Sequence, residues 1–411
     1  MAQDQMAASE TLPETTWVCQ ACLADQTLKA MNCDLEEVRV CNVCAGTTRS
    51  ALTAATIARL IAEILPEHFE IDCQLHPGYE MTLDEIVGRA IGSDSEVIRR
   101  AVAEALEDEN AGEEDFYWPG QEYMRAQTPF DSEDHERWYV VGSWRRIADE
   151  LAHGQRYFND AARGFFERLI EEALGAVDPE RPGTPAVVTI HDAGTSFYRA
   201  RVAADELAAR RILEDPEAGL GVAPRERAAN NRMSPAGVPL LYVSRHVDTC
   251  IAEVRPSIGD TVVVGRFEST KPLRFFDFTM LDRWLAYEPL SLLDASYRGR
   301  SELRILLHYL HDEISRPVRA SDTGYVPTQA LAEFIRGEKN WGFDGIAFQS
   351  VQHQGGVNYV LFDRGLPESI HWHGWRPTFH VQICREEVYR HVVERVHFIH
   401  RRQGECTPSE R

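Results

Sequence analysis

The chain of 411 residues is long enough for two or three domains, each with a sizeable hydrophobic core. Apolar residues make up 44% of it and charged residues 26%, which is normal for a globular chain and excludes a disordered, collagen-like or coiled-coil protein. The formal net charge is −22, and residues 1–185, with 15 basic and 36 acidic side chains, account for −21 of it. Such a field repels phosphate backbones, so we expect no nucleic-acid partner for this half of the chain.

Membrane segments and targeting signals are not expected. No uncharged apolar stretch reaches the ~18 residues that a membrane span requires. The best candidate, residues 51–65, contains Arg59 and Glu63. The first residues have neither the basic nor the apolar segment of a secretory signal. We therefore expect a cytoplasmic protein with no membrane partner.

Four of the nine cysteines have the spacing of a metal site, namely Cys19 and Cys22, followed by Cys41 and Cys44. Each C-x-x-C turn points two thiolates at one ion, and two such turns complete the four-sulfur coordination that suits Zn²⁺. The spacing predicts a structural zinc ribbon in residues 1–48. Reduced surface thiols or a redox pair are the alternatives, although nothing nearby resembles a thioredoxin unit.

A helical pattern follows in residues 49–178, with apolar residues at spacings of three and four. Ser143 is predicted to cap a long helix that continues to Leu169. Arg146 and His153 lie seven residues apart on this helix, an arrangement that resembles the R-x6-H motif of HEPN-type ribonucleases. Surface or packing roles for the pair are the alternative, because two such residues easily occur together in a long helix.

Glycine and proline reach helix-breaking density in residues 175–185 and mark a domain boundary. Residues 186–366 then alternate short β-branched and aromatic runs with helical segments, which predicts an α+β domain. The remaining residues, 367–411, contain His371 and His373, which we expect to pack against the main domain rather than to bind a metal. The predicted strands cover residues 187–190, 240–244, 261–267, 273–278, 345–349 and 358–362, and the predicted helices cover residues 204–214, 249–254, 301–309 and 328–336.

Several separated motifs in the second half occur in the order of one family. Arg232, Tyr242 and Glu253 follow one another at intervals of ten and eleven residues, and Ser350 precedes Asn358 by eight. With their neighbours, these residues closely resemble the RES domain, which is named for its Arg, Glu and Ser. This domain is the toxin half of Xre–RES toxin–antitoxin pairs. Taken singly, each residue also fits an ordinary structural role, but together they favour a functional site.

The resemblance covers about residues 190–365 and implies an ADP-ribosyltransferase-like fold. The expected fold class is therefore an α+β RES domain preceded by a small zinc ribbon and a helical domain. The front of the chain is similar, more loosely, to the zinc-ribbon and HEPN-like region attached to some RES proteins. The resemblance also implies an enzyme that cleaves NAD⁺ at the nicotinamide–ribose bond, and an antitoxin or inhibitory protein as a partner. Water, phosphate or a protein side chain would be the acceptor.

The residue types suit this chemistry. Glu253 would stabilise the oxocarbenium-like ribose that forms when nicotinamide leaves. Arg232 would clamp the pyrophosphate through its planar fork of donors, and Tyr242 would stack on the cationic nicotinamide. Ser350 and Asn358 would hydrogen-bond the ribose hydroxyls or the carboxamide.

Arg199 is a further candidate, because a first strand would deliver it to the same cleft on the adenosine or phosphate side. Protein ADP-ribosylation is the alternative reaction for this site. Two other classes of function remain open. One is a HEPN-type ribonuclease that uses Arg146 and His153, and the other is a binding module in which the ribbon and helices recognise a protein or restrain the toxic domain.

Overall fold

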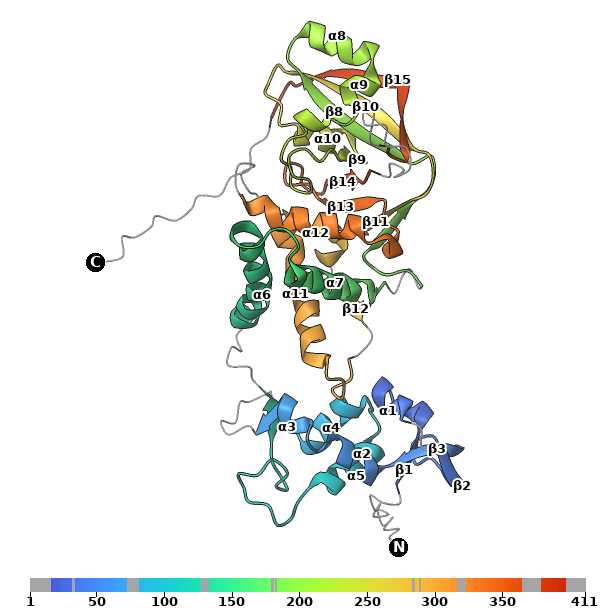
Figure 1. The fold of residues 1–411 in the computed structure, drawn as a ribbon. Coiled ribbons are helices and arrows are strands. Elements are labelled where there is room, and N and C mark those ends of the chain that lie inside the picture. The colour runs from blue at the N-terminus through green and yellow to red at the C-terminus, as the bar shows by residue number, and fades with distance from the viewer. Residues whose placement is uncertain are drawn as a thin grey trace, which may run out of the picture. The chain divides into compact units, whose positions relative to one another are not determined.

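The computed structural model divides the chain into two compact units (Figure 1). The first unit comprises residues 1–140 and 288–305, and the second comprises residues 141–287 and 306–411. Helices and strands are both abundant, so the predicted mixed α and β class is confirmed. The structure describes residues 16–31, 34–71, 81–126, 133–178, 181, 183–282, 285–287, 290–315, 323–363 and 378–396.

A three-stranded antiparallel sheet opens the first unit, in the order β1-β3-β2. One C-x-x-C pair lies at the end of β1, and the other lies in the turn that joins β2 to β3. Strand β3 continues past residue 49, where the helical pattern was expected to begin, because its threonines favour extended backbone. The strands are β1 (Trp17–Cys19), β2 (Asp34–Val40) and β3 (Thr47–Thr53).

Short helices form most of the rest of this unit. The Thr53 side chain caps α2, and Thr82 with Glu85 forms a capping box at α4. The apolar faces of the helices share one buried core with Val18 and Leu52 of the small sheet. The elements are α1 (Gln26–Ala30), α2 (Ala54–Ile61), α3 (Leu65–His68), β4 (Phe69–Ile71), α4 (Leu83–Ile91), α5 (Glu96–Leu106) and β5 (Tyr123–Arg125).

Two helices replace the single long helix predicted from Ser143. Helix α6 (Glu133–His153) begins ten residues earlier, so Ser143 lies inside the helix and the predicted cap is wrong. In the loop that follows, Phe158 has a φ of 54° and is 96% exposed. A left-handed residue cannot continue a right-handed helix, so the chain starts again at the Asn159 cap of α7 (Asp160–Leu174).

An eight-stranded mixed sheet forms the framework of the second unit, in the order β15-β10-β8-β9-β14-β13-β11-β7. Neighbouring strands are antiparallel except for β11 and β13, which are parallel. All six predicted strands are present within two residues of their expected ends, and these predictions are confirmed. The strands are β7 (Val188–His191), β8 (Ser196–Ala203), β9 (Leu241–Ser244), β10 (Thr261–Ser269), β11 (Leu273–Asp277), β13 (Gly345–Gln349), β14 (Val357–Leu361) and β15 (Val381–Val392).

The four helices predicted in this half are also confirmed, as α8, α10, α11 and α12. His371 and His373 lie outside the described residues. No helix in the described part of the chain is long and apolar enough to cross a membrane. The remaining elements are α8 (Glu206–Glu214), α9 (Pro216–Leu220), α10 (Val247–Glu253), α11 (Tyr297–Ser315), α12 (Val326–Gly337) and the paired strands β6 (Ala176–Val177) and β12 (Ala286–Tyr287).

The sheet is nearly divided between β8 and β9. These strands share a single residue pair, Tyr198 with Ser244. On its other side β8 pairs with β10 through eight residues, while β9 pairs with β14 through four. The sheet therefore consists of two well-paired halves that meet at one residue pair. The cavity described below lies beside this pair.

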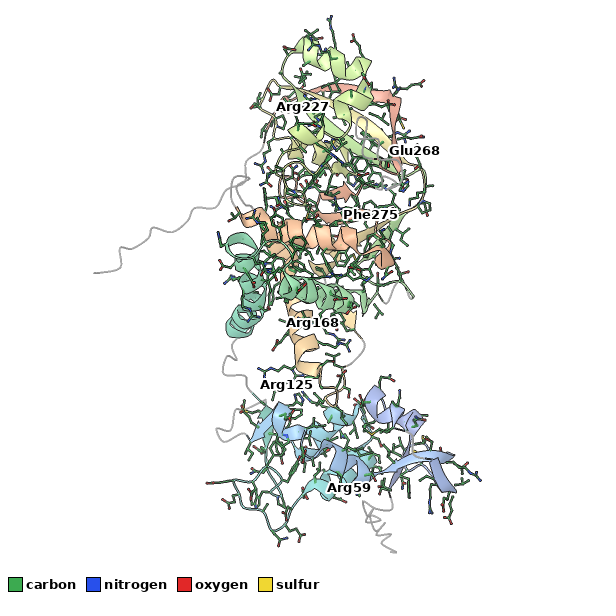
Figure 2. All side chains as sticks on the ribbon, viewed as in Figure 1. Arg59, Arg125, Arg168, Arg227, Glu268 and Phe275 are labelled. Carbon is green, nitrogen blue, oxygen red and sulfur yellow. The ribbon has the colours of Figure 1, made fainter. Side chains whose placement is uncertain are left out.

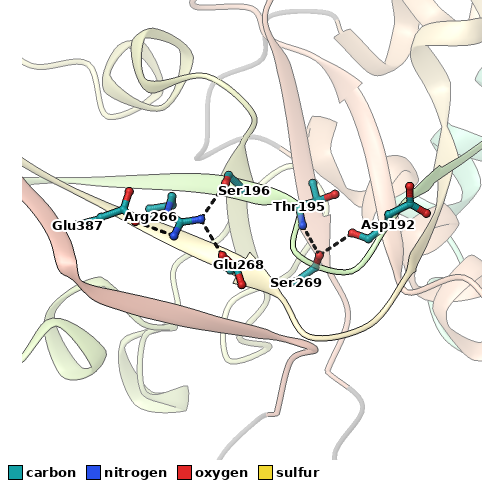
Figure 3. A network of polar contacts seen from close by, with 7 residues as sticks. All are labelled: Asp192, Thr195, Ser196, Arg266, Glu268, Ser269 and Glu387. Atoms are coloured by element: carbon teal, nitrogen blue, oxygen red, sulfur yellow. Dashed lines mark hydrogen bonds and ion pairs between the residues drawn. The ribbon is translucent and has the colours of Figure 1, made fainter.

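Arg266 ties one half of the sheet together where the register between β10 and β15 is interrupted (Figure 3). Its Nη1 donates to Ser196 Oγ of β8 (3.0 Å) and to Glu268 (2.8 Å), and its Nη2 pairs with Glu387 of β15 (2.6 Å). Glu387 and then Glu268 raise the pKa of Arg266. Strand β15 lies within residues 367–411, so the sheet takes in part of the segment that the sequence placed after the α+β domain of residues 186–366.

Candidate functional site

A cavity of about 840 Å³ lies beside the single pair that joins β8 to β9. Strand β8 contributes Arg199 to its wall, and β9 contributes Tyr242. Ser350 does not line the cavity but contacts a residue that does. The cavity brings together five of the residues singled out from the sequence, Arg199, Arg232, Tyr242, Glu253 and Asn358.

Glu253, the last residue of α10, is the only carboxylate among the described residues that line the cavity. Its Oε1 accepts hydrogen bonds from Ser350 Oγ (2.6 Å) and from Asn358 Nδ2 (2.7 Å). Ser350 Oγ in turn accepts the N–H groups of Gln352 (3.2 Å) and His353 (3.1 Å). These contacts fix the carboxylate between β13 and β14, with no cation paired to it among the described residues.

The loop after Ser350 packs closely against α10. Thr249 Oγ1 lies 2.8 Å from His353 Nδ1, and the Gly356 carbonyl accepts the N–H of Ser350 (2.8 Å). A Cβ on Gly356 would lie 2.7 Å from Thr249 Oγ1 and 3.0 Å from His353 Nδ1. Only glycine lets this loop approach the helix closely enough to bring Ser350 to Glu253.

Arg232 lies in the loop before β9 and is held by elements that follow much later in the chain. Its Nη1 donates to the Ile314 carbonyl at the end of α11, and its guanidinium lies 5.3 Å from the centre of the Tyr325 ring. The Arg232 carbonyl accepts the hydroxyl of Thr328 on α12 (2.8 Å). Burial lowers the pKa of Arg232, against the opposing effect of Tyr325 and Glu253.

Tyr242 and Arg199 connect the two halves of the sheet around the cavity. The Tyr242 hydroxyl accepts the N–H of Met233 (3.2 Å) and lies 3.2 Å from Ser234 Oγ, so it also anchors the Arg232 loop. Burial raises the pKa of Tyr242 to about 12. Arg199 Nη1 reaches from β8 to the Tyr242 carbonyl on β9 (3.3 Å), and burial followed by Arg201 lowers the pKa of Arg199.

Three further arginines and a tyrosine, Arg201, Arg227, Arg255 and Tyr325, line the cavity without having been singled out from the sequence. Arg201 could have been predicted, because it follows Arg199 by two residues and so lies on the same face of the strand. Tyr325 and Arg227 lie in short turns that no local pattern connects to the motifs.

In the first unit, the sulfurs of Cys19, Cys22, Cys41 and Cys44 all lie within 4.8 Å of one another. The sulfurs of Cys19 and Cys44 are 3.8 Å apart, which matches the edge of ~3.8 Å in a tetrahedron with Zn–S bonds of ~2.3 Å. Burial raises the pKa of Cys41, but the N–H groups of Cys19, Cys44 and Val43 outweigh it and lower that pKa to about 6. Four soft sulfur donors this close to one another fit Zn²⁺.

Arg146 and His153 are both exposed on α6, the helix on which the sequence placed them. No hydrogen bond or ion pair of the described residues joins them to each other or to a carboxylate. The structure therefore brings no third catalytic group to this pair within the part of the chain that it describes.

The second unit is thus a mixed α and β domain in which a serine and an asparagine hold one carboxylate at an arginine-rich cavity. Residues 197–380 match the family model of the RES domain. The match lies where the motif order predicted a RES domain, and this NAD-related, ADP-ribosyltransferase-like family is consistent with an enzyme that acts on NAD⁺. Searches of curated proteins and of solved structures found no match.

Proposed function

We propose that the RES domain cleaves NAD⁺ at the bond between nicotinamide and ribose, with the chemistry centred on Glu253. One observation carries the proposal. The Glu253 carboxylate is held by Ser350 (2.6 Å) and Asn358 (2.7 Å) at a cavity whose other charged lining residues are all arginines. A fixed negative charge of this kind suits a reaction that develops positive charge on the substrate.

The bond between ribose C1″ and the nicotinamide nitrogen breaks, and its electron pair leaves with nicotinamide. The ribose becomes oxocarbenium-like, and the carboxylate of Glu253 stabilises that charge while it orients the acceptor. When water is the acceptor, its oxygen bonds to C1″ and one proton is released, giving nicotinamide and ADP-ribose. Phosphate would instead give ADP-ribose-1″-phosphate, and a protein side chain would become ADP-ribosylated.

Arg232 and Arg199 suit the two phosphates of the dinucleotide. A guanidinium donates two parallel hydrogen bonds to a phosphate, which an ammonium cannot do. The contact of Arg232 with the Tyr325 ring and the Ile314 carbonyl restricts its side chain before substrate arrives. Restriction of this kind lowers the entropy lost on binding.

The four cysteines of the first unit would bind one structural Zn²⁺. The ion would fix the two C-x-x-C turns of the small sheet and would take no part in cleavage of NAD⁺. We further propose that the active domain is restrained in its cell by an antitoxin, as the RES family implies.

The decisive experiment incubates the purified protein with NAD⁺, with and without phosphate, and identifies the products by mass spectrometry. Free ADP-ribose indicates hydrolysis, ADP-ribose-1″-phosphate indicates phosphorolysis, and a mass gain on protein indicates transfer. Glu253→Gln, which keeps the shape of the side chain but removes its charge, should lower turnover by ~10²–10³-fold. Intact NAD⁺ under every condition would overturn the proposal.

A further inference from the structure

The cavity holds more positive charge than NAD⁺ requires. Five arginines and one carboxylate line it among the described residues. The two negative charges of the NAD⁺ diphosphate match Arg199 and Arg232, to which the proposed function assigns them. Three arginines, Arg201, Arg227 and Arg255, remain without a role, and of these Arg201 and Arg227 are close enough to affect each other.

Arg201 is half-buried on β8, beyond Arg199, and its Nη2 donates only weakly, at 3.4 Å, to the Gly221 carbonyl. No ion pair joins it to a carboxylate within the described ranges. Burial lowers the pKa of Arg201, and the nearby Arg227 lowers it further. Arg201 is therefore a cation that the protein alone does not neutralise.

Arg227, labelled in Figure 2, lies on the short 3-10 turn η2 (Arg225–Arg227). It lines the same cavity as Arg201. It is exposed, and in the part of the chain that the structure describes it too has no carboxylate partner. Two guanidinium groups that repel each other across a cavity are stabilised when an anion lies between them. A phosphate monoester, with a charge near −2, matches such a pair of donors.

We propose that Arg201 and Arg227 form a subsite for a phosphate monoester, and that the substrate carrying it is a 2′-phosphorylated nicotinamide dinucleotide, NADP⁺. The inference rests on the proposed function, because it takes the diphosphate and the reacting ribose to lie at Arg199, Arg232 and Glu253. It adds a substrate preference that this function does not require.

The position of the subsite favours the adenosine end of the substrate over an acceptor phosphate. The Glu253 carboxylate accepts a hydrogen bond from the side chain of Asn358 on β14. Asn358 is the strand partner of Ser244 on β9, and Ser244 is the strand partner of Tyr198 on β8. Arg201 lies three residues beyond Tyr198 on β8, or ~10 Å along the strand, and two residues beyond Arg199, which the proposed function assigns to the diphosphate. An acceptor phosphate must reach ribose C1″ beside Glu253, whereas the 2′-phosphate lies at the opposite end of the dinucleotide.

The test measures kcat/KM for NADP⁺ and for NAD⁺ in the wild type and in Arg201→Gln and Arg227→Gln. We expect the wild type to favour NADP⁺ by about tenfold or more, since hydrogen bonds between charged groups are lost when the 2′-phosphate is absent. Each variant should reduce the ratio of the two constants about tenfold. Arg225→Gln, on the same turn but outside the cavity, is the matched control and should keep the wild-type ratio.

Binding of adenosine 2′,5′-bisphosphate and of adenosine 5′-monophosphate, measured by calorimetry, separates this inference from the proposed function. A preference for the bisphosphate that Arg227→Gln removes supports the subsite even if no dinucleotide is cleaved. Equal use of NADP⁺ and NAD⁺ by an active enzyme would overturn the subsite and leave the function intact. Stimulation of NAD⁺ cleavage by inorganic phosphate that both variants remove would also overturn it, because the subsite would then hold the acceptor.

Discussion

Ser350 would affect the reaction only indirectly, by holding Glu253, because it contacts that carboxylate without lining the cavity. It is a positioning residue, and Ser350→Ala should lower kcat about tenfold, the value of one hydrogen bond to a charged group, while KM for NAD⁺ changes little. Ser350→Thr keeps the hydroxyl and should recover most of kcat. A merely structural role would instead lower thermal stability with kcat preserved in the folded fraction.

Substitution of Arg232 tests whether binding of NAD⁺ requires a guanidinium or only a positive charge. Arg232→Lys keeps the charge but loses the planar fork and the contact with the Tyr325 ring. We expect KM for NAD⁺ to rise about tenfold or more, with a smaller fall in kcat. Steady-state kinetics check the result, and a lysine variant with wild-type KM would show that charge alone is recognised.

The sequence indicated which residues belong together at the site, but not how they act. The order and spacing of the motifs identified five residues, and the structure places all five at the cavity or in contact with one another. They are Arg232, Tyr242, Glu253, Ser350 and Asn358. Their tertiary partners come from distant turns and helices. That the Tyr242 hydroxyl anchors the Arg232 loop depends on such packing, which no local pattern encodes.

Among the elements, the small cysteine-bearing sheet should depend on its metal. Purified protein should contain one zinc per chain, and Cys22→Ser should abolish that binding. Because ~10–16 kcal/mol of binding energy contributes to folding in such sites, the variant should expose the core shared by the sheet and helices of the first unit. Elemental analysis and limited proteolysis check this, and Cys384→Ser, outside the cluster, should retain the zinc.

The loop between β13 and β14 should not tolerate a side chain at Gly356. Gly356→Ala places a methyl group 2.7 Å from Thr249 Oγ1, so the loop must shift and withdraw Ser350 from Glu253. We expect a loss of about 1–3 kcal/mol of stability, together with reduced activity. Gly337→Ala at the end of α12 meets nothing within 4 Å and serves as the matched control. Equal melting temperatures for the two variants would contradict this account.

Elements with strong local patterns were predictable, and those set by distant contacts were not. Strand β13 (Gly345–Gln349) was predicted residue for residue, because a buried apolar run between turns leaves few alternatives. Strand β15 was not predicted, since its arginines and glutamates break the alternation and Glu387 pairs with Arg266 instead. Ser143 resembled a helix cap, but the helix already includes the ten residues before it, so Ser143 lies in the helix interior.

For the whole molecule, the charge argues against an RNA substrate. A net charge of −22, almost all of it in the first half of the chain, opposes the counterion release that drives binding to phosphate backbones. The double variant Arg146→Ala with His153→Ala should therefore consume NAD⁺ at the wild-type rate, and neither protein should degrade RNA. Incubation with labelled RNA at low salt is the measurement. Degradation that the double variant lacks would favour the ribonuclease interpretation instead.

The single pair between Tyr198 and Ser244 has a consequence for the internal motions of the sheet. Beyond Tyr198, the backbone of β8 has a strand neighbour on one side only, within the part of the sheet that the structure describes. Amide protons that point toward β10 are protected by a continuous ladder, and those that point toward the cavity are not. Deuterium should therefore enter β8 at alternate residues, and a ligand that fills the cavity should slow exchange on the open side alone.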